Sequence, residues 1–316
     1  MRVEKLQELR EKGFICDGQF TQIESIVTHK VISVFYELRT MLYLGVMLFT
    51  TGVGFLIYQN IGQLGHILAI IALSILSIAS LGYCFLKGKP FSKEKVGSPN
   101  PYFDYVLLLG CLLFVSVFGY LEFQFGFLEH NARPVSLITA VLFFFFAYRF
   151  DHLGILSLAV TAFVSFFGIV VSWNNLESFD QLQNGGLVLA LILGCVAILL
   201  EKLKIKPHFT FTYLNFCFLI YFLSAFAGIF NGHSGNYLPY ALALYLGVGL
   251  SVFLANWKKS FLFLLYGVIA GYIATTYFLA DNTNMGVEPW LLYLLVSAGG
   301  LVYFIVTYRN YFKRTE

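Results

Sequence analysis

Ten runs of mostly apolar residues, each long enough to cross a lipid bilayer, occupy most of this 316-residue chain. A helix needs about 20 such residues to span the hydrocarbon core, where its internal hydrogen bonds satisfy the backbone. The chain is therefore predicted to be all-α, a polytopic transmembrane helix bundle of about ten spans. The predicted spans are about 41–59, 66–86, 102–122, 132–148, 153–173, 183–200, 210–230, 237–256, 261–280 and 290–308.

Composition supports the same class. Hydrophobic residues make up 59% of the chain and charged residues only 12%, whereas soluble domains carry about 25% charged residues. Such a chain has too little charge to cover a water-facing surface, so we expect the lipid bilayer as its surroundings. The formal net charge of +3 is small, and we expect no nucleic acid partner.

The positions of the basic residues test the number of spans. Lys and Arg near helix ends stay on the cytoplasmic side of a membrane. With ten spans and a cytoplasmic N-terminus, all 20 basic residues except Arg133 fall on that side. Fusing 132–148 with 153–173 would instead turn Lys202, Lys204, Lys206 and the basic end of the chain outward. We therefore expect ten spans with both termini in the cytoplasm.

The first 36 residues form a different kind of element. Val3, Leu6 and Leu9 recur at helical spacing, and Asp17 is placed to cap a second helix. We predict a short cytosolic helical hairpin at 1–36, a transmembrane bundle at 37–308 and a basic cytosolic tail at 309–316. A hairpin this small cannot bury enough surface to be stable alone. We expect it to pack on a protein partner, on a second copy, or on the inner faces of the bundle.

The segment Leu6-Gln7-Glu8-Leu9-Arg10-Glu11-Lys12-Gly13-Phe14-Ile15, followed by the capped helix and many spans, resembles a bacterial family. It is a family of predicted membrane proteins of unknown function (domain of unknown function 2157), and the resemblance lies mainly in the hairpin and first span. It implies a multi-pass protein of the bacterial inner membrane. It implies no activity and no catalytic residue.

Ionisable residues in the middle of a span mark proton or ion paths. The centres of the predicted spans contain no Asp, Glu, Lys, Arg or His, and Asp104 and Glu122 lie at the edges of theirs. A proton- or sodium-coupled transporter is therefore disfavoured.

The uncharged polar residues give one candidate intramembrane polar site, made of Asn215, Tyr221, Tyr266 and Tyr272. A buried amide needs hydrogen-bond partners. Asn215 therefore either bonds to a neighbouring helix or contributes to a ligand site, and the three tyrosines are equally open to both interpretations.

The sequence predicts no catalytic, cofactor or metal site. The five cysteines and six histidines are scattered, and the chain has no Walker loop or HExxH motif. Gly232-His233-Ser234-Gly235 matches a pattern of rhomboid proteases, but it falls in a short exterior turn, and no predicted span has a central histidine. The long inner loop from Lys87 to Pro101 offers no acid–base pair beyond Glu94 and the nearby Asp104.

Three hypotheses follow. The first is a non-enzymatic membrane component that docks a partner, or a second copy, through residues 1–36. The alternative is a small-molecule permease or exporter built from two five-helix repeats. The third is an enzyme acting on lipids, which would need a polar cluster at one membrane face.

Overall fold

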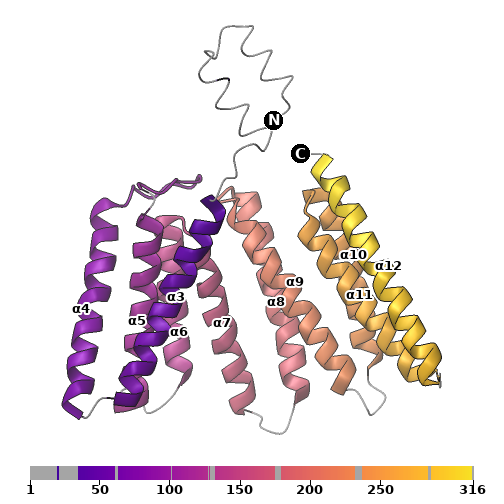
Figure 1. Cartoon of the computed structure of the whole chain (residues 1–316), viewed down its shortest axis with the longest axis horizontal. Helices are drawn as coiled ribbons and strands as arrows, with labels where there is room; N and C mark the ends of the chain where they lie inside the picture. Colours follow the sequence, from indigo (N-terminus) through magenta and orange to yellow (C-terminus); the bar gives the residue numbers. More distant parts are fainter. Residues whose placement is uncertain are drawn as a thin grey trace. The chain divides into compact units, whose positions relative to one another are not determined.

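The computed structural model of the chain is shown in Figure 1, coloured along the sequence. It describes residues 20, 35–60, 63–100, 102–126, 128, 132–174, 179–231, 237–283 and 286–314. Within these ranges the chain forms ten helices: α3 (Phe35–Asn60), α4 (Gln63–Lys87), α5 (Phe103–Phe125), α6 (Ala132–Phe150), α7 (Leu153–Asn174), α8 (Phe179–Leu203), α9 (Phe209–Asn231), α10 (Leu238–Lys258), α11 (Phe261–Asn282) and α12 (Val287–Arg314).

The predicted all-α fold class is confirmed, because the described residues form helices and loops and contain no strand. Each predicted span corresponds to one helix. Eight of the described helices are long and apolar enough to cross a membrane. The other two, α3 and α7, contain the shorter apolar segments Thr40–Val53 and Leu153–Gly168. The protein is a membrane protein with several membrane-spanning helices. Residues 309–314, predicted as part of a separate tail, continue α12. The predicted hairpin at 1–36 lies outside the described residues, apart from Phe20 and the start of α3.

The chain divides into two compact units. The first comprises residues 1–84 and 102–117, and the second comprises residues 85–101 and 118–316. In the first unit the Ser77 hydroxyl donates to the Gly110 carbonyl oxygen at 2.9 Å, which joins α4 to α5. Cys84 on α4 and Leu107 and Cys111 on α5 are fully buried. Gly110 permits the approach, because a Cβ there would lie 3.0 Å from the side chain of Leu81.

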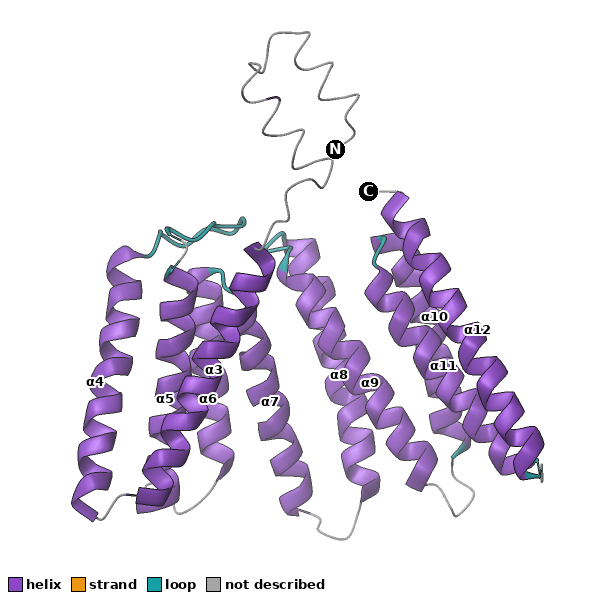
Figure 2. Cartoon of the chain, in the orientation of Figure 1, coloured by secondary structure: helices purple, strands orange, loops and turns teal. Residues whose placement is uncertain are grey.

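In the second unit α6 packs along α7, α8 along α9, and α10 along α11. Helix α9 also contacts α7, α10 and α11, while α12 contacts α11. The turns after α6 and α8 and the loop 88–101 are joined by hydrogen bonds and an ion pair. A further ion pair joins the ends of α8 and α10. We call this side of the second unit the loop end, consisting of residues 88–101, 151–152, 204–208 and 259–260. Figure 2 shows these loops in teal.

A glycine in α10 lets α9 and α10 approach closely. A Cβ at Gly247 would lie 2.3 Å from a ring carbon of Tyr221 on α9. The Tyr221 hydroxyl in turn donates to the Ala243 carbonyl oxygen at 2.6 Å. Small residues serve this purpose in membrane bundles, where dispersion contacts and interhelical bonds hold helices together.

Gly247→Leu should therefore destabilise the bundle, by about 1–3 kcal/mol for an overpacked site, since the Tyr221 ring must move and lose its bond to Ala243. Gly249→Leu is the matched control, because a Cβ at Gly249 would meet nothing within 4 Å. The measurement is the fraction of each purified variant that stays folded after heating in one detergent. Equal loss for the two variants would contradict the assigned packing.

Candidate functional site

The four predicted polar residues of the bundle do not gather at one point. The Tyr266 hydroxyl on α11 donates to Asn215 Oδ1 on α9 at 2.7 Å. Tyr221 bonds to the backbone of α10, and Tyr272 on α11 pairs with Ser297 on α12 at 3.0 Å. Each of these groups therefore joins two different helices. The structure brings Asn215 and Tyr266 together and directs the other two tyrosines to different neighbours.

A polar cluster that the sequence analysis missed lies at the loop end. Its centre is the carboxylate of Asp151, whose side chain is 1% exposed. Asp151 Oδ2 accepts the Val96 N–H at 2.6 Å and lies 3.3 Å from Lys206 Nζ. Asp151 Oδ1 lies 2.5 Å from His208 Nε2. A buried carboxylate with an ion-pair partner and two further hydrogen-bonding groups is well compensated for its lost hydration.

Local backbone geometry places Asp151 there. It forms a two-residue turn with His152 between α6 and α7, and its φ of 59° lies in the left-handed region. Asp and Asn are the non-glycine residues that adopt this region most readily. His152 then starts α7, because its Nδ1 accepts the Ile155 N–H at 3.1 Å. The tight reversal leaves the Asp151 carboxylate facing the neighbouring loops.

Lys206 is the partner that makes the cluster costly to disturb. Its side chain is 1% exposed, and its ammonium group lies over the rings of Phe91 and Phe209 at 5.4 and 5.6 Å. These cation–π contacts supplement the ion pair with Asp151. A buried ammonium without its carboxylate would be strongly unfavourable.

Three hydrogen bonds hold the long loop 88–101 against the ends of the neighbouring helices. The Arg149 guanidinium donates to the Lys89 carbonyl oxygen at 2.6 Å. The Lys206 N–H donates to the Lys93 carbonyl oxygen at 2.8 Å, and Val96 bonds to Asp151. A second ion pair, between Lys258 and Glu201, joins the ends of α10 and α8. The loop end is thus a fixed surface.

The Asp151–His208 pair has no bonded nucleophile among the described residues, since no hydroxyl or thiol there is hydrogen-bonded to His208. No group of three or more His, Cys, Asp or Glu in the described ranges could hold a metal ion. We interpret the cluster as a lock on the loop end.

Sequence reasoning missed this lock because its members come from three loops. A signal was present in Asp151, an acidic residue in a turn predicted to lie on the basic side of the membrane. Glu122, at the edge of its predicted span, is buried in the structure, and its carboxylate accepts the Leu128 N–H at 2.6 Å.

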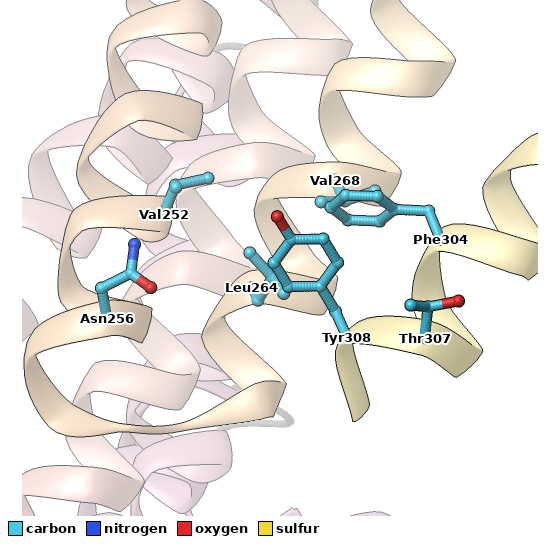
Figure 3. Close-up of a pocket in the computed structure, with 7 residues that line it drawn as sticks. All are labelled: Val252, Asn256, Leu264, Val268, Phe304, Thr307 and Tyr308. Atoms are coloured by element: carbon cyan, nitrogen blue, oxygen red, sulfur yellow. The ribbon is translucent and has the colours of Figure 1, made fainter. Parts of the chain in front are cut away.

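A second unpredicted feature is a groove between α10, α11 and α12, shown in Figure 3. Its volume is about 540 Å³. Figure 3 shows Asn256 and Tyr308 reaching into it from α10 and α12, whereas the Thr307 hydroxyl points away. The groove is lined by Val252, Asn256, Leu264, Val268, Phe304, Thr307 and Tyr308.

Together, the apolar helices, the interhelical polar bonds and the basic loop end define a polytopic membrane protein. Residues 7–156, a little under half of the chain, match the family model described as predicted membrane protein (DUF2157). This match confirms the resemblance inferred from the sequence. No curated protein and no solved structure matches the chain.

The lock predicts a specific pattern of protection. Asp151→Asn keeps the turn geometry but leaves Lys206 without its counter-charge, which should weaken the loop end by about 3 kcal/mol. We expect faster trypsin cleavage after Lys93 and Lys95 in the folded, detergent-solubilised protein. Asp281→Asn, which removes one exposed carboxylate at the other end of α11, is the control and should leave cleavage unchanged.

Adding Lys206→Met to Asp151→Asn should restore most of the protection, because a buried ion pair can be replaced by apolar side chains at little cost. Equal cleavage rates for Asp151→Asn and Asp281→Asn would show that the Asp151 carboxylate does not hold the loop.

Proposed function

We propose that the protein is a non-enzymatic component of the bacterial inner membrane that docks a protein partner, or a second copy of itself, through residues 1–36. The observation that carries the proposal is how the bundle uses its polar groups. Asn215, Tyr221, Tyr266 and Tyr272 all bond from one helix to another. A solute pathway would instead need such groups to converge on one cavity.

The loop end supports a docking role on the cytoplasmic side. Its fixed loops and the adjoining helix ends carry exposed lysines, and Lys and Arg are retained on the cytoplasmic side of a membrane. With this end in the cytoplasm, ten spans also place both termini there. The exposed lysines are Lys87, Lys89, Lys93, Lys95, Lys202, Lys204 and Lys259.

The alternative function is a small-molecule permease or exporter built from two five-helix repeats. The groove between α10, α11 and α12 is the observation in its favour. However, none of the four polar candidates lines that groove. The compact units also differ in size, because the first contains only α3, most of α4 and part of α5. The docking role therefore has the stronger support.

The orientation can be tested by cysteine labelling in a background that lacks the five native cysteines. Lys95→Cys should be protected from a membrane-impermeant maleimide in intact cells and become labelled after the membrane is opened. Gly235→Cys, in the loop between α9 and α10, should be labelled in intact cells. The reverse pattern would place the loop end outside and would remove the basis for cytoplasmic docking.

The docking role predicts that the apolar positions of residues 1–36 control assembly. Leu6→Glu with Leu9→Glu should abolish co-purification of a partner, or reduce the oligomer to a monomer, because an apolar contact face cannot bury carboxylates. Gln7→Glu with Gln19→Glu adds the same charge at polar positions and should leave assembly intact. The measurement is the mass of the purified full chain by light scattering, with in-cell crosslinking of the same variants.

If both double variants keep the wild-type mass and crosslinks, residues 1–36 do not dock anything and the proposal fails. Thermal unfolding of each variant in the same detergent controls for damage to the bundle.

A further inference from the structure

The groove between α10, α11 and α12 changes in chemistry along its length. Its residues furthest from the loop end, Val252, Val268 and Phe304, are apolar. Its residues one turn nearer to the loop end include Asn256 and Tyr308. The groove is therefore apolar within the span and polar where the helices reach the membrane surface.

The same end carries features of a membrane–water interface. Trp257 is exposed directly after Asn256, and aromatic rings of this kind lie at headgroup depth. Lys259 is exposed less than one turn beyond Asn256 and forms no ion pair with a described residue. A negative group at the mouth of the groove would meet the positive charge of Lys259.

The contacts of α12 explain why the groove exists. Two hydroxyl pairs join α11 to α12: Tyr272 with Ser297 at 3.0 Å and Thr276 with Tyr293 at 3.3 Å. Both pairs lie in the half of these helices away from the loop end. The groove occupies the other half, between Leu264 and Val268 on one side and Phe304 and Tyr308 on the other.

We propose that this groove is a binding site for a glycerophospholipid with an anionic headgroup, with one acyl chain along Val252, Val268 and Phe304. The headgroup lies at the loop end, where Asn256 donates a hydrogen bond and Lys259 supplies positive charge. A volume of about 540 Å³ falls within the range of about 300–1,000 Å³ that small-molecule sites occupy. This inference goes beyond the proposed docking function and does not depend on it.

A second groove, in the first unit, differs from the α10–α12 groove in its lining. It has a volume of about 440 Å³ and lies between α3 and α5. Its lining contains no polar side chain: Leu38, Met41, Leu42, Gly45, Val46, Phe49 and Leu109. Such a surface accommodates any acyl chain, whereas the α10–α12 groove combines an apolar channel with a polar and basic mouth.

The test is native mass spectrometry of the full chain, released from nanodiscs of palmitoyl-oleoyl phosphatidylglycerol mixed equally with palmitoyl-oleoyl phosphatidylcholine. We expect one retained phosphatidylglycerol per chain in the wild type. Val268→Trp fills the groove and should remove that lipid. Leu246→Trp adds the same ring at an exposed position of α10 and should retain it.

Lys259→Gln tests recognition of the headgroup separately from binding of the acyl chain. This variant should keep one lipid but lose about fivefold in preference for phosphatidylglycerol over phosphatidylcholine, which is the contribution of one basic residue near an anionic headgroup. Asn256→Leu, which removes the amide at nearly constant volume, should also weaken retention.

Three results would overturn the proposal. Lipid retention unaffected by Val268→Trp would place the lipid elsewhere. Equal retention of both lipids by the wild type would exclude recognition of an anionic headgroup. A dimer that Val268→Trp dissociates would make a second copy of the chain the occupant of the groove.

Discussion

The hydrocarbon core of a membrane offers no hydrogen-bond partner, so every polar side chain that enters it must find one within the protein. In the second unit this constraint accounts for polar bonds that run from one helix to another. Helix α9 supplies three such groups: Tyr213 bonds to Tyr148 on α6, Asn215 to Tyr266 on α11, and Tyr221 to the backbone of α10. Apolar contacts alone would not choose these partners, because lipid tails are as apolar as the helix surfaces. The polar residues therefore add bonds to particular partners, beyond the apolar packing of the helix pairs.

The buried polar groups of the loop end also find their partners within the protein, although they lie at the ends of the spans. Asp151 and Lys206 leave water almost completely, and each compensates the other's lost hydration. Left-handed backbone at Lys204, Lys206 and Lys259 marks the turns that follow α8 and α10. Such residues cost of order 1–2 kcal/mol each and persist where surrounding contacts fix them. For Lys206 those contacts are the bond to Lys93, the ion pair and the two aromatic rings.

The sequence predicts the spans well because span length and hydropathy are local properties. Counting basic residues then distinguishes ten spans from nine, since each fusion would reverse every later loop. The same reasoning shows that Asn215 needs a partner but cannot identify Tyr266, which lies 51 residues further along. That pairing depends on how each helix is rotated about its axis, and no local pattern fixes this rotation. The Asp151 cluster was missed for a related reason, because Val96, Asp151 and Lys206 lie in three loops that are far apart in the sequence.

Helix α12 shows how uneven hydrogen bonding shapes a membrane surface. It is 28 residues long, and its span is the least buried of the eight. Its two hydroxyl pairs with α11 fix the half away from the loop end, so close packing there does not require close packing near Phe304 and Tyr308. A helix held at one half leaves a gap beside the other, and in a bilayer such a gap fills with acyl chains. The placement of Asn256, Tyr308 and Lys259 at the mouth of that gap is what turns a packing defect into a selective site.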